Sequence, residues 1–355
     1  MKRILTLLLA MLMVIALFVG CGKSSDADSE TEPKKEPETS TAEPKTSTGD
    51  YTNPLTGETC DVDLRDARPY CVMLNNIEVA QPQCGISKAD IIYEALVEGS
   101  CTRMMAIFSD ISDADVLGSM RSTRPYYIQL ALAYDGILVH AGGSEQAYSD
   151  IQTYDVDNID GVRGSYAGEV FYRDSSRMSE GYEHSLFTTG ANVTDHVKSA
   201  SIRTKHDQAT DYSLSFVEDG TPVNGSAASN ISVSFDGSKT TTFTYNEAEK
   251  TYTSAQFNST YTDGNNDVAP QFTNVLILFA DVSTLDDSGR RAVDLETTGT
   301  GYFACGGASV PIQWSHGGVG ENFRYTLSDG SALNLGTGKT YVCIVPNAGG
   351  SVTMQ

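Results

Sequence analysis

Two patterns of hydrophobic and polar positions follow one another along the chain. Between residues 51 and 205, short apolar runs typical of strands alternate with segments whose apolar residues recur at helical spacing. The runs predict strands at 68–75, 102–109 and 136–141, and the spacing predicts helices at 87–96, 125–134, 144–154 and 192–202. Ser87-Lys88-Ala89-Asp90 has the form of a capping box, which favours a helix start there. This alternation predicts an α/β N-terminal domain with a mixed or partly parallel sheet.

The pattern changes at about residue 206. Residues 206–355 are rich in Thr, Ser, Gly, Asn and Tyr, and their apolar positions alternate with polar ones, as in half-buried strands. Strands are predicted at 230–235, 240–245, 275–280, 310–314, 323–327 and 340–346. The sequence therefore predicts a β-rich C-terminal domain over 206–355 after an α/β domain over 51–205. The boundary is soft, and the two halves are free to share one sheet.

The N-terminus has the pattern of a bacterial lipoprotein leader. Lys2 and Arg3 precede an apolar run that ends in Leu17-Phe18-Val19-Gly20-Cys21. We expect a signal peptide and lipobox over residues 1–21 with lipidation at Cys21, although Phe18 stands where the lipobox usually has Leu. A simple membrane anchor and an ordinary cleaved signal are the alternatives. Residues 22–50 are polar and acidic, so we expect a disordered linker. The protein is then held at the cell membrane by lipid, on its extracytoplasmic face.

The charge excludes one class of function. The 355 residues carry a formal net charge of −22, and nucleic-acid binders need basic faces, so we expect no nucleic-acid partner. Nine of the twelve basic residues in 51–205 are arginines, which suit bidentate recognition of carboxylate or phosphate. A site for an anionic group is therefore expected in the first half.

Six cysteines follow the leader, and the sequence does not decide how they are used. An exported protein with an even number of cysteines favours disulfides. Cys71 and Cys343, however, lie in apolar runs where cysteine serves as a small core residue. The disulfide status of all six stays open: Cys60, Cys71, Cys84, Cys101, Cys305 and Cys343.

Several motifs occur together in a recognisable order. They are Asn53-Pro54-Leu55-Thr56-Gly57, Arg68-Pro69, Asn75-Asn76, Ser87 to Glu94, Thr102-Arg103, Met120 to Tyr126, His140 to Ser144, Phe171 to Asp174 and Gly336 to Thr340. In this order the chain resembles the YerB-like lipoproteins, a bacterial family of unknown function with two consecutive domains. The stretch at Tyr182 to Leu186 departs from the family pattern. The resemblance implies the two-domain fold and the lipid anchor, and it transfers no activity and no catalytic residue.

The first candidate site is the loop His140-Ala141-Gly142-Gly143-Ser144 between a predicted strand and a predicted helix. Ligands of α/β folds bind at the carboxyl ends of strands, which makes His140 a candidate binding or catalytic residue. Ser144 is a candidate ligand-binding residue there. It has two further interpretations, an N-cap, which we favour, and a nucleophile. The surrounding sequence is not the Gly-x-Ser-x-Gly motif of serine hydrolases.

Two further groups of residues are candidates. Arg103, Arg121 and Arg124, with Glu94 and Glu98 expected on one helix face, form either an anion pocket or a structural ion-pair network, and we favour the network. Arg173, in the other group, is also a candidate ligand-binding residue. Asp174, with His184, forms either an acid–base pair or a helix cap beside an exposed histidine. The five histidines are dispersed, so we expect no metal site, and no cofactor motif is present.

These observations predict a lipid-anchored envelope protein. Its function is most simply that of a binding or accessory module for a cell-wall component, a small anionic ligand or a protein partner. The alternative is an envelope hydrolase that uses His140 with a carboxylate, Asp174 or Glu98. The sequence does not decide whether the protein is an enzyme. The hydrolase requires His140, Arg121, Arg124, Arg173 and Asp174 to meet in one open cleft.

Overall fold

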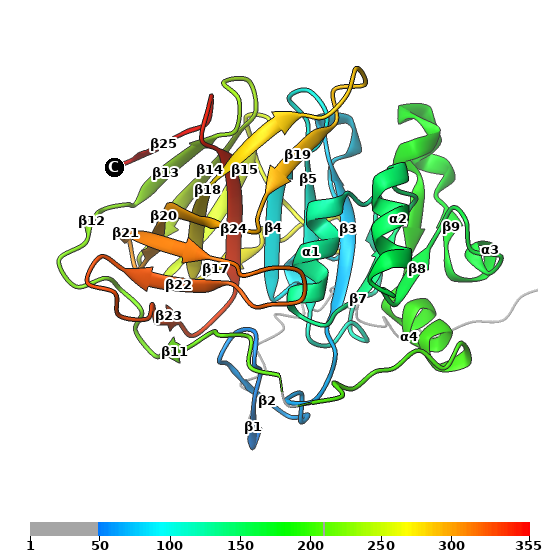
Figure 1. Ribbon diagram of the computed structural model, residues 1–355, viewed down its shortest axis with the longest axis horizontal. Coiled ribbons are helices and arrows are strands. Elements are labelled where there is room, and N and C mark those ends of the chain that lie inside the picture. The colour runs from blue at the N-terminus through cyan, green and yellow to red at the C-terminus, as the bar shows by residue number, and fades with distance from the viewer. Residues whose placement is uncertain (1–48, 209) are drawn as a thin grey trace, which may run out of the picture. The chain divides into compact units, whose positions relative to one another are not determined.

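The computed structural model describes residues 49–208 and 210–355 (Figure 1). The predicted signal peptide, the predicted lipidation site Cys21 and nearly all of the predicted linker over 22–50 lie outside these residues. Within the described part of the chain, no helix is both long and apolar enough to cross a membrane.

A sheet of twelve strands forms the centre of the fold. In spatial order, ten of them are β12 (Ser226–Ala227), β21 (Ala308–Ser315), β20 (Thr298–Cys305), β18 (Asn274–Thr284), β24 (Thr340–Pro346), β4 (Ile91–Leu96), β5 (Thr102–Phe108), β3 (Tyr70–Asn76), β7 (Ile137–His140) and β8 (Asn158–Asp160). The other two, β19 (Arg291–Asp294) and β22 (Arg324–Leu327), pair with β18 and β21. Strands β18, β24 and β4 are parallel, as are β3, β7 and β8, so the sheet is mixed.

The two sequence halves share this sheet, because β24 from the second half pairs with β4 from the first. The predicted fold class is confirmed: a mixed, partly parallel sheet with helices precedes a strand-rich region. Every strand predicted after residue 206 overlaps an observed strand. The predicted domain boundary at residue 205 stays a prediction.

A second sheet of six strands lies entirely in the second half. Its strands are β16 (Ser259–Thr260), β15 (Thr251–Gln256), β14 (Thr240–Asn246), β13 (Asn230–Ser234) and β25 (Ser351–Met354), with β17 (Gln271–Phe272) paired to β15. Three small sheets join β1 (Tyr51–Thr52) to β2 (Thr59–Cys60), β6 (Leu117–Gly118) to β10 (Leu186–Thr188) and β9 (Tyr172–Arg173), and β11 (Phe216–Val217) to β23 (Leu335–Gly336).

Within the described residues, the α-helices belong to the first half. They are α1 (Pro125–Ala133), α2 (Glu145–Thr153), α3 (Ala167–Val170) and α4 (Gly190–Ser199). Short 3-10 helices are η1 (Glu78–Ala80), η2 (Ile86–Lys88), η3 (Ser175–Glu180) and η4 (Tyr182–His184). Helix α1 begins at a proline, whose missing N–H costs nothing in the first turn. Helices α1, α2 and α4 confirm three of the four predicted helices.

The remaining helix prediction, over residues 87–96, is wrong. Residues Ile86–Lys88 form one turn of 3-10 helix, and Ile91–Leu96 is strand β4. All six residues of β4 are buried, because the strand lies between β24 and β5 and both of its faces are covered. A short apolar run that is buried on both faces has no periodicity that separates a strand from a helix.

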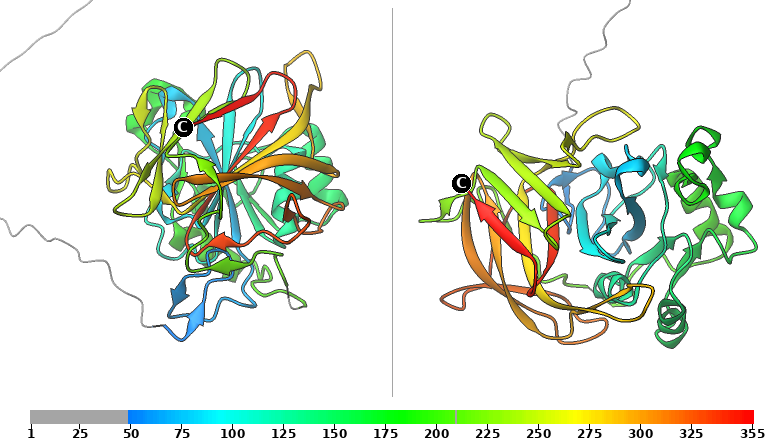
Figure 2. Two further views of the ribbon diagram at one scale, coloured as in Figure 1. Left: turned by 90° about the vertical axis from the view of Figure 1, so that its left-hand side faces the viewer. Right: turned by 90° about the horizontal axis from the view of Figure 1, so that it is seen from above.

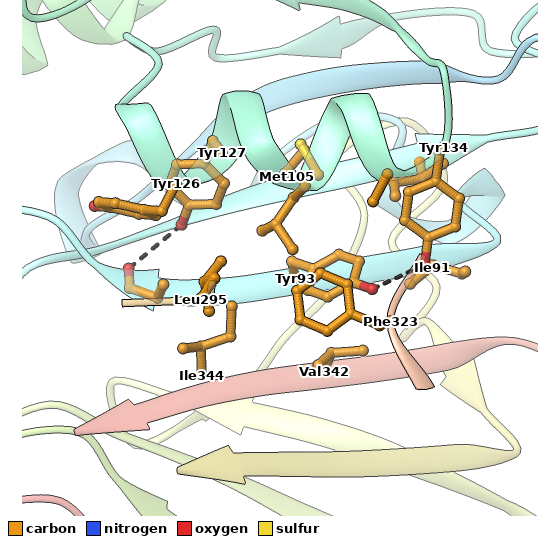
Figure 3. Packing of buried hydrophobic residues seen from close by; sticks show 14 of the residues in the cluster. Ile91, Tyr93, Met105, Tyr126, Tyr127, Tyr134, Leu295, Phe323, Val342 and Ile344 are labelled. Carbon is orange, nitrogen blue, oxygen red and sulfur yellow. Dashed lines mark hydrogen bonds between the residues drawn. The ribbon is translucent and has the colours of Figure 1, made fainter. Parts of the chain in front are cut away.

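The core lies on both faces of the large sheet. On one face, Tyr126 and Tyr127 of α1 and Tyr134 after it belong to one cluster with Tyr93, Met105 and Val342 (Figure 3). There the hydroxyls of Tyr93 and Tyr134 share a 2.8 Å hydrogen bond that satisfies two buried polar groups. On the other face, β13 to β15 pack against β18 and β24, so α1 and the six-stranded sheet lie on opposite sides of the large sheet (Figure 2).

The cysteines of the described residues are free thiols. Cys71, Cys84, Cys305 and Cys343 are buried, Cys60 is partly exposed and Cys101 is exposed. Cys71 and Cys343 occupy core strands, as their apolar surroundings predict. Burial raises the pKa of Cys71 to about 12, so this thiol is protonated and unreactive at neutral pH.

Candidate functional site

The candidate site lies where parallel strands end. Strands β3, β7 and β8 run parallel, so their carboxyl ends meet at one edge of the sheet. Residues 119–124, called the 119–124 segment below, lie between two of these ends. On one side, Asn75 N–H donates to Ser119 O and Arg121 N–H donates to Met73 O, each at 3.0 Å. On the other side, Ala141 N–H donates to Arg121 O at 3.0 Å.

Glu98 holds two of the three predicted arginines. Its Oε2 lies 3.1 Å from the Arg103 guanidinium, and its Oε1 accepts a 2.9 Å hydrogen bond from Arg124 Nε and a second bond from Arg124 Nη2. Burial on its own would raise the pKa of Glu98, but the two guanidinium groups outweigh it and hold that pKa below its ordinary value. This part of the cluster is a charge-paired network.

The expected pairing of Glu94 with Glu98 on one helix face is wrong. Glu94 lies in strand β4, whereas Glu98 follows the strand. The Glu94 carboxylate points to the side of the six-stranded sheet, where it accepts from Thr241 at 2.8 Å and lies 3.3 Å from Lys239 Nζ. Glu94 therefore takes no part in the arginine cluster.

Arg121 differs from its two neighbours. Among the described residues, its guanidinium has neither an ion pair nor a hydrogen bond, and its Nε is buried without a partner. Burial lowers the pKa of Arg121, and Glu183 and Glu98 are the carboxylates that oppose this shift. A half-buried arginine with no bonded counter-charge is costly unless something supplies one.

Two hydroxyls of the same segment are also without partners. Within the described residues, Ser119 Oγ and Thr123 Oγ1 are buried and form no hydrogen bond. Both side chains are 0% exposed. Three unsatisfied polar groups in five consecutive residues are unusual, because buried polar atoms are nearly always bonded in native proteins.

His184 lies beside this segment and is buried, which corrects the expectation of an exposed histidine. Its side chain is 7% exposed, and Nδ1 accepts a 2.8 Å hydrogen bond from Asn75 Nδ2. Burial lowers the pKa of His184, and the positive charge of Arg121 lowers it further. The ring is therefore neutral at pH 7, with its proton on Nε2, 3.9 Å from Glu183 Oε1.

His140 lies at the end of β7 as predicted, but it is fully buried. Its Nδ1 is 2.8 Å from Gly142 O, and its Nε2 is 3.1 Å from Asn158 Oδ1. Both ring nitrogens are therefore occupied by neighbouring oxygens. Ser144 is the N-cap of α2, because its Oγ accepts from Ala147 N–H at 3.2 Å.

Arg173 and Asp174 serve local structure. The Arg173 guanidinium lies 3.7 Å from the centroid of the Tyr182 ring and donates to the Tyr182 carbonyl. Asp174 caps η3 by accepting from Ser176 N–H at 2.9 Å. Within the described residues, no hydrogen bond or ion pair joins His140 to Asp174 or Glu98. The single cleft that the hydrolase requires is not formed by these contacts.

In residues 49–208 and 210–355, no three His, Cys, Asp or Glu side chains are grouped closely enough to hold an ion. The features that the sequence did not reveal are Asn75, the burial of His184 against it, and the two buried hydroxyls. Asn75 lies in one of the motifs that carry the family resemblance, which was the only signal available for it.

The chain is similar to known proteins in both sequence and fold. Residues 55–203 match the family described as "Protein of unknown function (DUF3048) N-terminal domain", and residues 231–342 match the corresponding C-terminal domain. The chain is 31% identical over 301 residues to "Putative lipoprotein YerB" of Bacillus subtilis (strain 168), covering 83% of this chain and 86% of that protein. A crystal structure of YerB from Bacillus subtilis superposes with a TM-score of 0.74 at 27% identity, covering 85% of this chain and 99% of that one.

Proposed function

The chain belongs to the two-domain DUF3048 family, whose function is unknown, and from this premise we propose that it is a lipid-anchored envelope protein that binds a small anionic group at the 119–124 segment. The relative from Bacillus subtilis is itself named a putative lipoprotein. That name supports a membrane anchor for this chain as well. Lipidation at Cys21 and an extracytoplasmic position are parts of the proposal.

One observation carries the binding function: the Arg121 guanidinium is partly buried, with its Nε fully so, and has no bonded partner among the described residues. Glu98 is already paired with Arg103 and Arg124, and neither it nor Glu183 forms an ion pair with Arg121, in a protein whose net charge is −22. A carboxylate or phosphate group would accept the parallel N–H bonds that an arginine presents. Such a ligand would supply the counter-charge that Arg121 lacks.

The surroundings of Arg121 support the same class of ligand. The neutral ring of His184 keeps a donor at Nε2, and Ser119 and Thr123 have hydroxyls without partners. These groups donate to anionic oxygens and add no negative charge. A cell-wall component or a protein that carries a carboxylate or phosphate group would use the same contacts.

No observation favours the hydrolase. His140 would have to accept a proton from a nucleophile, but both of its ring nitrogens face other oxygens in a fully buried setting. Ser144, the nearest hydroxyl in sequence, caps a helix. Binding without catalysis therefore explains more of the geometry.

Thermal denaturation of the full-length chain with inorganic phosphate and with citrate tests the proposal. A ligand at 100 times its dissociation constant stabilises the folded state by about 2.7 kcal/mol, which raises the midpoint measurably. Arg121→Gln removes a group that has no partner, so it should leave the unliganded midpoint unchanged and abolish the ligand-induced rise. Arg65→Gln removes the same charge from an exposed pair with Asp63 and should behave like wild type.

The proposal fails if neither anion raises the midpoint of the wild type. It fails equally if Arg121→Gln and wild type respond alike. A response that Arg65→Gln also loses would show that net charge, and not the 119–124 segment, governs the effect.

A further inference from the structure

The C-terminal end of β3 has a second group of polar residues, on the side away from the 119–124 segment. Asn75 faces His184, whereas the next residue, Asn76, faces Glu94, to which its Nδ2 donates at 2.8 Å. Beyond Asn76 lies a pocket of about 260 Å³ between the η1 region and the hairpin of β15 and β16. Its lining includes Gln81, Pro82, Gln256, Phe257 and Tyr261, and it shares no residue with the 119–124 segment.

Phe257 occupies an unusual backbone position in this pocket. Phe257 and Asn258 are the two residues of the tight turn between β15 and β16, with φ of +53° and +60°. Two-residue hairpin turns of this kind favour Asn and Gly, because positive φ strains a residue with a bulky side chain. An aromatic residue at the first position therefore costs stability, and strain of this kind clusters at functional sites.

The pocket also contains two neighbouring polar side chains, Tyr261 and Gln81, whose hydrogen bonding is incomplete. Among the described residues, the Tyr261 hydroxyl is buried and has no hydrogen-bond partner of normal geometry, and the residue is 4% exposed. The side chain of Gln81 lies beside this hydroxyl, interacts with it and has a long 3.5 Å contact to Asn76. A ligand that donates and accepts hydrogen bonds would satisfy both groups.

The charges of the pocket disfavour an anionic ligand. Lys239, whose Nζ lies 4.4 Å from the Phe257 ring centroid, is not part of the lining, and its charge is paired with Glu94 at 3.3 Å. The charged side chain that does line the pocket is Glu78, which is exposed. An aromatic ring, an amide and a hydroxyl without a free cation suit a neutral polyhydroxylated ligand.

We propose that this pocket binds one ring of a neutral saccharide, with Phe257 as the stacking surface and Tyr261 and Gln81 as hydrogen-bonding groups. Its volume lies near the lower end for small-molecule sites, which limits the bound unit to about one sugar ring. Exposed Ser259 and Thr260 at the rim leave room for the rest of a longer chain. This site goes beyond the proposed anion site and does not depend on it.

Isothermal titration calorimetry of the full-length chain with maltotetraose, with the tetramer of N-acetylglucosamine and with inorganic phosphate tests this site. Phe257→Asn suits the turn better than phenylalanine, so it should melt at or above the wild-type midpoint while weakening saccharide binding at least about tenfold. Tyr261→Phe removes a buried hydroxyl that makes no hydrogen bond of normal geometry, and it should likewise preserve folding but weaken binding. Tyr154→Asn changes an exposed tyrosine elsewhere and is the control.

The proposal is supported if one tetrasaccharide binds saturably, the two pocket variants lose that binding, and Tyr154→Asn and Arg121→Gln keep it. Two results would overturn it: neither saccharide binds at up to about 10 mM, or Phe257→Asn binds as tightly as wild type. The pocket would also be rejected if Arg121→Gln lost saccharide binding while Phe257→Asn kept it. Because phosphate is a separate arm, failure here leaves the anion site untouched.

Discussion

Glu94 and Lys239 form a buried ion pair that joins the two sequence halves, with Glu94 Oε1 3.3 Å from Lys239 Nζ. The side chains are 0% and 5% exposed. Glu94 also accepts hydrogen bonds from Asn76, Thr102, Thr241 and Tyr341. Both carboxylate oxygens are thus surrounded by donors, which is the condition under which a buried charge is tolerated.

Removing one partner of this pair should destabilise the protein strongly. Lys239→Met leaves the Glu94 carboxylate buried without its counter-charge, and we expect a loss of about 3–5 kcal/mol in the free energy of unfolding. Urea denaturation of the full-length chain measures it. The double variant Glu94→Gln/Lys239→Met should lose less than Lys239→Met alone, because no charge remains buried. A double variant as unstable as the single one would show that packing, and not charge, sets the cost.

Ser144 should matter for stability but not for binding. Its Oγ accepts from Ala147 N–H at the start of α2, so Ser144→Ala should cost about 1 kcal/mol, and Ser144→Asp should retain most of the stability. Urea denaturation and the phosphate-induced thermal shift, measured on the same variants, separate the two roles. If Ser144→Ala abolishes the shift while the helix is stable, Ser144 contacts the ligand and the N-cap is not its whole role.

Most strands and helices could be predicted from the pattern of apolar positions. In these elements the spacing of the apolar residues matches the face that is buried. Helix α1 and strand β24 fall where their sequences place them. Strand β4 was mistaken for a helix because its neighbours cover both faces and remove the alternation that marks a strand. The same error placed Glu94 beside the arginines, since a strand and a helix direct a given residue to different sides.

Only part of the candidate site could be predicted from the sequence. Arginine enrichment in the first half identified Arg121, but not which of three arginines lacks a partner, because that depends on where Glu98 lies after β4. The burial of His184 follows from its contact with Asn75, which is remote in the sequence. Phe257 gave no signal, since positive φ is a property of the hairpin and not of the residue.

The acid stability of the protein should depend on Glu98. Its pKa is lowered in the folded state by Arg103 and Arg124, so its stabilising contribution is present above its ordinary pKa of 4.5 and is lost as pH falls through the folded value. Glu98→Gln should cost about 3 kcal/mol at pH 7, because it leaves the buried Arg103 without a counter-charge. The variant should also lose less stability than wild type between pH 5 and pH 3, in urea titrations. Parallel pH profiles would contradict the pairing.

The titration of His184 reports directly on Arg121. Burial and the Arg121 charge both lower the pKa of this histidine, so Arg121→Gln should raise it towards the ordinary value of 6.5. NMR titration of the imidazole signals, assigned with His184→Gln, measures the shift. Arg65→Gln, which removes an exposed charge that is not among the causes of the His184 shift, should leave the pKa unchanged.

The stability of the protein and the response of His184 to a bound anion should also depend on the proximity of His184 to Arg121. Neutral His184 stabilises the folded state above pH 6.5, and this contribution is lost as pH falls through the lowered folded pKa. An anion bound to Arg121 would offset the guanidinium charge and raise the pKa of His184, as the substitution does. Saturating phosphate should therefore shift the wild-type titration upwards and leave that of Arg121→Gln where it was. A phosphate-dependent shift of equal size in both proteins would place the anion elsewhere.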